Sequence, residues 1–377
     1  MVGERSRISS TNRTFTRLVA DLQQQMHRSG VDFADMRGAD SLELIFAGAA
    51  SRAVLEPSRE THEIKPLEGQ SHIGSLAVPW PAESRSCLGC FLDGSQRTLR
   101  VWRMGLVPVI ATIAAAGVLQ RDGRGAATLL PGTLRLQHTW LIPRHAGNPE
   151  VDALVARLDA AGSDIVDPLE QWENTSDYAA MTNDYGRMVE AAYTAAREVR
   201  HKLEIELLDQ WPNQLRGVAD ACWLVVDGRL RLAVPRAVGL VKDITNQHLQ
   251  GSDALELFNL QPGYRTTAFY PSDRRRSTRL VTVAPEATGE HRPALWYLRM
   301  RSPEGQDARH ALIRVEAPHD VTGTQHINAL SAWLLAERSP RPTADARWDT
   351  LLYPVHYLEQ ILKNHVAGTT RGWPGAR

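Results

Sequence analysis

Three acidic side chains are placed where the sequence could build a site for divalent cations. Asp93 and Asp227 each end an apolar run and precede a glycine, so each is expected near the tip of a buried strand. A long helical stretch between them carries Glu204 and Glu206. Carboxylate oxygens are the ligands that Mg²⁺ and Mn²⁺ prefer. Two such ions ~3.5–4 Å apart activate water and stabilise the leaving oxygen when a phosphodiester is cleaved.

The helix can turn only one of its two glutamates toward such a site. Residues 204 and 206 point about 200° apart at 3.6 residues per turn. Glu204 directly follows Leu203, which lies on the apolar face of the helix, so Glu204 is the chosen third acid. Another interpretation stays open, because Asp-Gly is a common turn dipeptide. In that case the chain is an unrelated binding protein, and Asp93 and Asp227 lie far apart.

The elements that would position these acids alternate between strands and helices. Strands are predicted at residues 87–92, 98–102, 105–119, 126–142, 221–226, 230–234, 237–241, 295–300 and 311–315. The first two are expected to join through an Asp-Gly hairpin turn. Helices are predicted at residues 14–27, 184–209, 326–337 and 353–364. This order indicates an α/β fold, a mixed sheet flanked by helices.

Two segments are expected as additions to this fold. Residues 1–80 are interpreted as an N-terminal helical and loop extension, with much of 54–76 read as loop. Phe15, Leu18, Leu22 and Met26 recur at helical spacing within it. Residues 81–377 would form the main domain, with an acidic, turn-rich insertion near 146–180.

The composition is that of a globular protein whose charges balance. Of 377 residues, 43% are hydrophobic, and 43 basic residues match 43 acidic ones. A disordered tail protein and a protein that coats nucleic acid through bulk charge are therefore excluded, and any nucleic-acid contact must come from a local patch. The arginines at 274–276 and Arg279 are one candidate, the alternative being a solvated loop. Only four basic residues are lysines, a bias that suits phosphate binding but also follows from a GC-rich genome.

Several other functions lack their sequence signals. No GxGxxG follows a strand and no GxxxxGK[ST] occurs, which disfavours a dehydrogenase or an intrinsic ATPase. The lone CxxC at 87–90 has no second ligand pair for zinc, so the three cysteines are expected in the core of a reduced, cytoplasmic protein. No signal peptide is expected, and the longest apolar run, 105–119, is too short to span a membrane.

A set of short motifs, in order, resembles the NurA family of nucleases. Residues 90–95 (Cys-Phe-Leu-Asp-Gly-Ser) resemble the first catalytic motif of the family, and 224–230 (Leu-Val-Val-Asp-Gly-Arg-Leu) resemble its second. Residues 239–242 (Gly-Leu-Val-Lys) resemble the strand that follows, and 200–204 (Arg-His-Lys-Leu-Glu) the helix with the metal-binding glutamate. Residues 298–300, 313–316 and 353–354 resemble the C-terminal elements, so the resemblance spans roughly residues 85–365.

The resemblance implies an RNase H-like mixed sheet and a Mn²⁺-dependent (or Mg²⁺-dependent) DNA nuclease. Members of the family usually act as homodimers with a hexameric HerA-type ATPase translocase, in DNA end processing or antiviral defence. By resemblance, Asp93, Glu204 and Asp227 would be the metal ligands, and Tyr353 would line the site.

One departure from the family concerns its C-terminal helix. The family usually has a histidine eight residues after the tyrosine, where this chain has Ile361. His356 and His365 lie on the same predicted helix, near the face of Tyr353, and either could substitute. The departure also leaves open a second interpretation, a catalytically weak or inactive scaffold subunit that docks on a translocase.

Four further residues are open to two interpretations. Lys242 is expected to contact either a scissile phosphate or a nearby carboxylate, or else to be a solvated charge on an edge strand. Trp296 and Tyr297 could stack on bases, but aromatic residues in a strand more often belong to the core. Glu316 could be a further acid near the site, although a surface or hairpin role is favoured.

Overall fold

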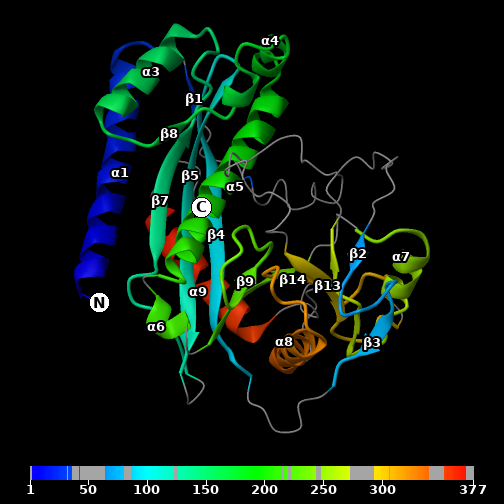
Figure 1. Ribbon diagram of the computed structural model, residues 1–377. Helices are drawn as coiled ribbons and strands as arrows, with labels where there is room; N and C mark the ends of the chain where they lie inside the picture. The colour runs from blue at the N-terminus through cyan, green and yellow to red at the C-terminus, as the bar shows by residue number, and fades with distance from the viewer. Residues whose placement is uncertain are drawn as a thin grey trace.

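The computed structural model describes residues 2–31, 33–35, 42, 64–79, 86–122, 126–213, 215–219, 222–242, 248–271, 293–304, 306–338 and 352–370. Strands in these residues form one 14-stranded mixed sheet, and helices pack against it (Figure 1). The predicted α/β class is therefore confirmed. The arginine cluster predicted at 274–279 lies outside the described residues.

The long central strands carry the candidate site. They are β4 (Leu88–Met104), β5 (Val107–Arg121), β7 (Arg135–Leu141), β9 (Trp223–Asp227) and β10 (Ala237–Val241). Their order in the sheet is β7-β5-β4-β9-β10. The first three form an antiparallel meander, whereas β9 and β10 run parallel to β4. Nearly every residue of β5 is buried, as expected for a strand covered on both faces.

The sheet continues beyond β10 through a second group of strands. They are β14 (Leu312–Ala317), β13 (Ala294–Arg299), β12 (Phe269–Tyr270), β2 (Lys65–Pro66), β11 (Tyr264–Thr266) and β3 (Ser75–Ala77). The predicted hairpin between residues 295 and 315 is confirmed by the antiparallel β13–β14 pair. Because β2 and β3 pair with β12 and β11, the described part of the loop predicted at 54–76 contributes two short strands to the same sheet.

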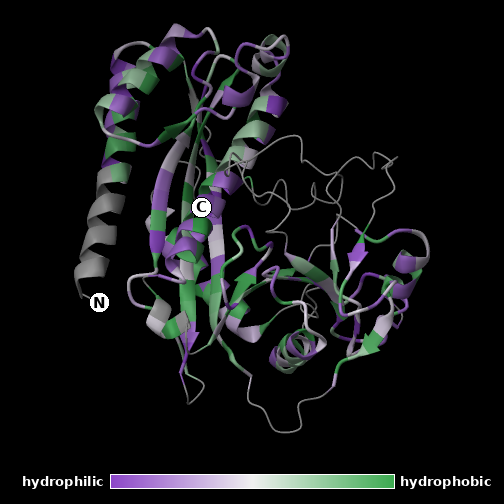
Figure 2. Cartoon of the chain, in the orientation of Figure 1, coloured by the Kyte–Doolittle hydropathy of each residue, from purple (hydrophilic) through white to green (hydrophobic). Residues whose placement is uncertain are grey.

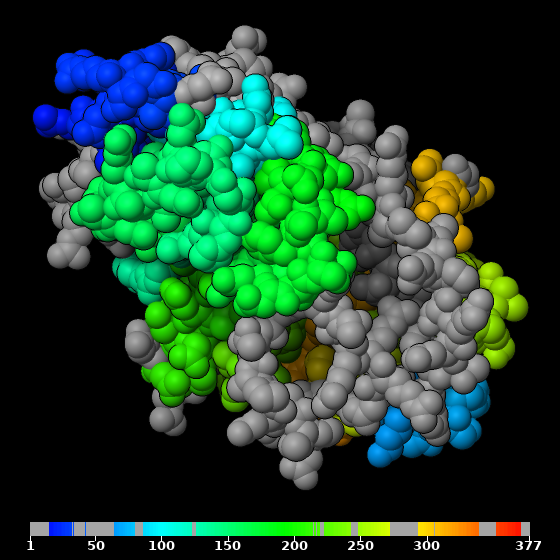
Figure 3. Space-filling model, turned by 90° about the horizontal axis from the view of Figure 1, so that it is seen from above, coloured from blue at the N-terminus to red at the C-terminus, as the bar shows by residue number. Residues whose placement is uncertain are grey.

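The remaining elements lie around these strands. They are α1 (Val2–Arg28), β1 (Ala34–Asp35), β6 (Ala127–Leu129), α3 (Pro149–Ala160), β8 (Ile165–Val166), the 3₁₀ turn η2 (Glu170–Trp172), α4 (Tyr178–Thr182), α5 (Tyr185–Gln210), α6 (Arg216–Ala219), α7 (Gly251–Phe258), α8 (Thr324–Glu337) and α9 (Tyr353–Thr370). The chain around α1 and α3 lies at one end of the molecule, and β2, β3 and α7 lie at the other (Figure 3). No described helix has the length and apolar character needed to cross a membrane.

Helices α5 and α9 cover opposite faces of the central strands (Figure 1). Leu203 and Leu207 of α5 pack in one cluster with Leu92 of β4. Leu358 and Leu362 of α9 belong to the other large cluster, which contains the neighbouring strand residue Phe91. Alternate residues of a strand point to opposite faces, so the two helices lie on either side of β4. Figure 2 shows hydrophobic residues concentrated along these strands.

The N-terminal helix confirms the predicted amphipathic pattern. Phe15, Leu22 and Met26 are buried, and Leu18 packs against the same core. The ring of Phe15 stacks on Trp140 of β7, with centroids 5.4 Å apart. Helix α1 is therefore part of the main core.

Two sequence predictions about the strands are wrong. The Asp-Gly pair at 93–94 is not a hairpin turn, since β4 continues through it and pairs with β5 as far as the true turn at Gly105, where φ is 57°. Residues 230–234 are not a strand: they form part of the connection from β9 back to β10, where Leu230 and Val234 pack in the cluster that contains α5.

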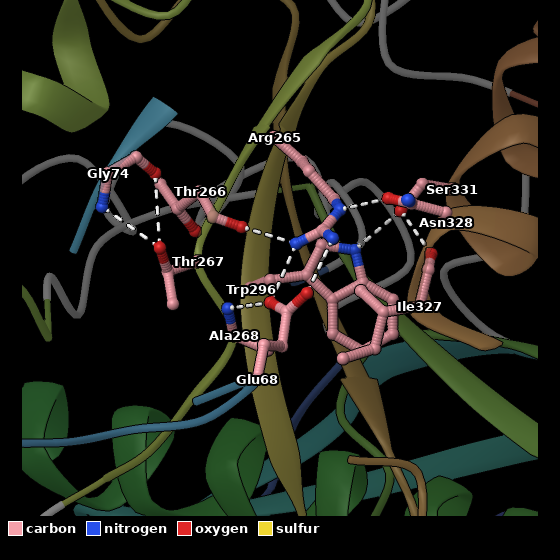
Figure 4. A network of polar contacts seen from close by, with 10 residues as sticks. All are labelled: Glu68, Gly74, Arg265, Thr266, Thr267, Ala268, Trp296, Ile327, Asn328 and Ser331. Carbon is pink, nitrogen blue, oxygen red and sulfur yellow. Dashed lines mark hydrogen bonds and ion pairs between the residues drawn. The ribbon is translucent and has the colours of Figure 1, made fainter. Parts of the chain in front are cut away.

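A buried ion pair ties the N-terminal strands to the rest of the sheet. Both oxygens of Glu68 accept hydrogen bonds from the Arg265 guanidinium, at 2.7 and 2.8 Å, and neither side chain is more than 1% exposed. Glu68 also accepts a hydrogen bond from the Ala268 amide, and Arg265 Nε donates to Asn328 of α8 (Figure 4). The bidentate geometry and the additional partners offset the cost of burying both charges.

The cysteines agree only in part with the predicted core positions. Cys90 is buried and Cys222 is half-buried, but Cys87 is exposed. The prediction is therefore wrong for Cys87, which precedes the first residue of β4.

Candidate active site

The two aspartates lie on adjacent parallel strands. Leu92 of β4 pairs with Val226 of β9, so the next residue of each strand, Asp93 and Asp227, lies beside the other. Neighbouring strands are about 4.8 Å apart, and residues in register on parallel strands point to the same face. The structure thus brings together two acids that are far apart in the sequence. Asp93 lies inside a long strand, and Asp227 ends one.

Glu204 approaches this pair from the α5 side, where its carboxylate lies against the backbone of Gly94. Leu92 and Val226 face α5, so strand alternation turns Asp93 and Asp227 toward the other face. Gly94 faces α5, and a Cβ at this position would collide with Glu204 Oε1 and lie 2.9 Å from Arg200 Cγ. The missing side chain of Gly94 therefore makes the space that the Glu204 carboxylate occupies.

Of the two glutamates of α5, Glu204 is the one that faces the strands. Glu204 is 7% exposed, whereas Glu206 is on the exposed side of the helix. Glu204 is close enough to the aspartates to interact with them electrostatically. It raises the pKa of Asp93, and Asp227 raises the pKa of Glu204.

Two basic side chains form ion pairs with two of the three acids. Lys242 Nζ, which follows β10, lies 2.8 Å from Asp227 Oδ1. Of the interpretations open for Lys242, the structure therefore supports contact with a carboxylate. Arg200 Nε lies 3.3 Å from Glu204 Oε1, one turn away on α5. Asp93 Oδ1 accepts a hydrogen bond of 2.7 Å from the Gly94 amide.

The site is electrostatically crowded. Burial raises the pKa of Asp93 well above its ordinary value, and Asp227 and Glu204 raise it further, while Lys242 and Arg200 oppose the shift. Burial also raises the pKa of Glu204, against the influence of Arg200 and Arg231. Buried carboxylates that repel one another are stabilised in their charged form when a cation binds between them.

The donor set fits a hard divalent cation. All three acids offer carboxylate oxygens, which suit Mg²⁺ and Mn²⁺, and neither sulfur nor imidazole is required. Across the part of the chain that the structure describes, no three His, Cys, Asp or Glu side chains surround one point closely enough to hold an ion as they stand. Lys242 and Arg200 instead contact the carboxylates that would serve as ligands.

Helix α9, which carries the predicted tyrosine and histidines, packs against β4 and β5. Leu358 and Leu362 of α9 lie next to Gly117, which pairs with Asp93. Tyr353 is the first residue of the helix and is 58% exposed. His356 is half-buried, with Nδ1 3.7 Å from Glu359 Oε2, and His365 is half-buried two turns further on. Their catalytic roles stay predictions.

The favoured surface or hairpin role of Glu316 is right for the hairpin, since Glu316 pairs with Leu295 in the β13–β14 hairpin, and wrong for the surface. Glu316 is 3% exposed and bonds Arg314 Nη2 at 2.8 Å. Its other oxygen accepts a hydrogen bond of 2.9 Å from the Leu230 amide, which fixes the turn just after Asp227. Gly239 makes room for this turn, because a Cβ there would lie 2.6 Å from the Leu230 nitrogen. Glu316 thus stabilises the backbone next to the acids.

The two aromatic residues of β13 are core residues, as favoured. Trp296 and Tyr297 are fully buried. Trp296 Nε1 donates a hydrogen bond of 3.0 Å to Ser331 Oγ on α8 (Figure 4). Bases cannot stack on rings that are covered in this way.

Sequence reasoning missed a second group of polar residues beside Glu204. It consists of Glu198, Arg200 and His201 on α5 and Arg231 on the connection after β9. The i, i+3 and i, i+4 spacings of Glu198, His201, Arg200 and Glu204 were a signal for mutual contact on one helix. Arg231 had no such signal, because the contact joins two distant segments.

Comparison with protein-family models finds no match for this chain, and no curated protein matches it significantly.

Proposed function

We propose that this protein is a divalent-metal-dependent nuclease that hydrolyses phosphodiester bonds in DNA. The observation that carries the proposal is that Asp93 and Asp227 lie side by side on adjacent parallel strands, with the Glu204 carboxylate against the backbone of Gly94, the residue after Asp93. Two of the three acids, Asp93 and Glu204, are buried, and Asp227 is half-buried. Acids with raised pKa values gathered in one place favour a functional site.

The topology supports an RNase H-like core within the larger sheet. Three antiparallel strands (β4, β5, β7) are followed by the long helix α5 and then by two strands parallel to the first (β9, β10). This order, with the acids on the first and fourth strands and on the helix, is the arrangement expected of such a nuclease. It agrees with the motifs that resemble the NurA family.

The three acids would hold Mn²⁺ or Mg²⁺. When bound, such ions activate water for attack on phosphorus and stabilise charge on the leaving oxygen. The protein's own contribution is positioning. Lys242 holds the Asp227 carboxylate, Gly94 leaves room for that of Glu204, and Glu316 fixes the turn that follows Asp227.

Partners and setting are proposed from the resemblance alone. They are a homodimeric assembly, a HerA-type hexameric ATPase, DNA as substrate, and a cytoplasmic role in DNA end processing or antiviral defence. Tyr353, with His356 or His365, would line the site from α9.

A second candidate is a scaffold subunit with a weak or inactive site. The observation that favours it is the pairing of Glu204 with Arg200 and of Asp227 with Lys242, because cations already neutralise two of the three acids.

A cleavage assay separates the two candidates. Labelled single- and double-stranded DNA would be incubated with Mn²⁺, Mg²⁺ or EDTA, using the wild type, Asp93→Ala and the exposed control Glu206→Ala. The nuclease proposal predicts metal-dependent cleavage that Asp93→Ala lowers by at least about 100-fold, more than the loss of an outer-shell partner, with the control unaffected. Absence of cleavage by the wild type with either metal would support the scaffold.

A further inference from the structure

His201 gathers two arginines at the edge of the acid site. It is buried on α5, and its Nε2 lies 2.9 Å from Arg200 Nη2 and 3.1 Å from Arg231 Nη2. A guanidinium can only donate, so Nε2 must accept both hydrogen bonds. Nδ1 then carries the proton and donates to Glu198 Oε1 at 3.3 Å. The imidazole is therefore neutral, in accord with the pKa of His201, which burial lowers.

This arrangement leaves most of the arginine donors available. A guanidinium has five N–H groups. Within the described residues, His201 is the one hydrogen-bond acceptor of Arg231, and Arg200 adds only the ion pair with Glu204. Arg231 is half-buried, and burial lowers its pKa against the influence of Glu198 and Glu204. Two cations are thus held next to one neutral ring, and most of their N–H groups have no hydrogen-bond acceptor among the described residues.

Arg200 and Arg231 lie next to the three acids of the candidate active site. Arg200 contacts Glu204 and packs against Gly94, the residue after Asp93. Arg231 lies close enough to Glu204 to lower its pKa, and it is four residues beyond Asp227. Exposed arginines flank the pair on the same two segments, Arg197 on α5 and Arg229 after β9.

We propose that Arg200 and Arg231, oriented by His201, bind a backbone phosphate of the nucleic acid next to the bond that is cleaved. Guanidinium groups bind phosphate oxygens through two parallel hydrogen bonds. His201 is a positioning residue, since it fixes both arginines without contacting the substrate. This inference rests on the proposed function, because it takes the acids as the cleavage site.

A purely structural role is the competing explanation. On that view, the arginines only neutralise Glu198 and Glu204, which both carry charge close to them. Removing Arg231 would then change stability but leave affinity for DNA unchanged.

Binding can be measured separately from cleavage. The probe would be a short fluorescein-labelled DNA, followed by fluorescence anisotropy in EDTA at several salt concentrations. Arg231→Ala should weaken binding by about 10-fold and reduce the slope of log K against log salt by about 1, as expected for the loss of one phosphate contact. Arg231→Lys, which keeps the charge but loses the planar fork, should recover only part of the affinity. Arg187→Ala is the matched control on α5, because its side chain is 58% exposed near the other end of the helix.

A double-mutant cycle tests the role of His201. His201→Leu removes the acceptor and should weaken binding about as much as Arg231→Ala, and the double variant should be little worse than either alone. His201→Gln restores an acceptor oxygen and should rescue binding. Additive losses, or failure of the glutamine to rescue, would contradict a positioning role.

The outcomes separate this inference from the proposed function. If Asp93→Ala abolishes cleavage while Arg231→Ala binds DNA with wild-type affinity and salt slope, the inference fails and the nuclease stands. If the wild type cleaves nothing with any metal but Arg231→Ala still loses affinity, the phosphate site stands and the nuclease fails. Thermal melts of each variant verify folding. Arg231 lies in a connecting segment, so Arg231→Ala tests the phosphate site even if a substitution of Arg200 on α5 prevents folding.

Discussion

Asp93 is a buried carboxylate within the electrostatic influence of two other acids, and its environment disfavours its charged form. Burial, Asp227 and Glu204 all raise its pKa above the ordinary value of 3.8. A group whose folded-state pKa is raised gives its full stabilisation below the unfolded-state pKa, and this stabilisation is lost as pH rises through the folded-state pKa. The metal-free protein thus retains this acid at a cost to stability, as active sites commonly do.

Asp93→Asn should therefore stabilise the metal-free protein at neutral pH. We expect the free energy of unfolding at about pH 7 to rise by roughly 0.5–2 kcal/mol, because the amide carries no charge. The gain should shrink as pH falls toward about 4, where the aspartate is protonated in the folded state and about half protonated in the unfolded state. Urea unfolding in EDTA at the two pH values measures both effects, with Glu206→Gln as the exposed control. A variant less stable than the wild type at neutral pH would contradict this account.

Gly94 allows a separate test of how Glu204 is positioned. Gly94→Ala places a methyl group where the Glu204 carboxylate lies, so the flexible glutamate must move away from the aspartates. We expect a loss of metal-dependent cleavage of at least about 10-fold, similar to that of an outer-shell variant, with a cost in stability of about 1 kcal/mol. Gly368→Ala is the control, since nothing lies within 4 Å of a Cβ there. Wild-type cleavage by Gly94→Ala would mean that Glu204 is not a ligand.

At the scale of the elements, the Glu68–Arg265 pair joins the segment before β3 to β11 and α8 (Figure 4). Its energetic effect depends on burial. Both side chains are inaccessible to solvent, so removing one leaves the other charged, buried and unpaired.

Glu68→Ala should destabilise the fold by about 3–5 kcal/mol. The matched control is Asp307→Ala, which breaks an ion pair whose side chains are 62% and 64% exposed, and which should cost about 0–1 kcal/mol. Replacing both Glu68 and Arg265 by methionine should restore part of the loss, because no unpaired charge remains. Urea midpoints measure all three. Equal losses for the buried and exposed pairs would show that Glu68 and Arg265 contribute little.

The sequence predicts the regular elements and the choice of acids better than it predicts what surrounds them. Helical periodicity identifies α5 and favours Glu204 over Glu206, because both depend on spacing within one segment. The predicted Asp-Gly turn is wrong because the turn preference of a dipeptide takes no account of contacts with distant segments. Here Gly94 leaves space for Glu204, which is more than a hundred residues further along the chain. Glu316 is misjudged for a similar reason, since a charge in a strand suggests solvent until its partners from other segments are known.

At the scale of the whole molecule, the sheet continues from β8 to β2 and takes strands from most of the described chain. Helix α1 adds Phe15 and Met26 to the core that also contains Trp102 and Trp140. The described residues among the first 80 therefore contribute a helix, three strands and one side of a buried ion pair.

A variant that lacks residues 1–80 should accordingly fail to fold. Removal of residues 1–80 would expose the stacked rings of Trp102 and Trp140, together with the edges of β11 and β12. Circular dichroism and size-exclusion chromatography of the truncated chain measure the effect. A soluble, folded monomer that keeps cleavage activity would instead identify these residues as a separable extension.

The central claim is that Asp93, Asp227 and Glu204 together bind a divalent cation. Isothermal titration with Mn²⁺ tests it most directly, on the wild type, on Asp93→Asn and on the exposed control Glu206→Gln. The account predicts saturable binding by the wild type and the control, and its loss in Asp93→Asn. Binding that survives the substitution, or no binding by the folded wild type, would contradict it.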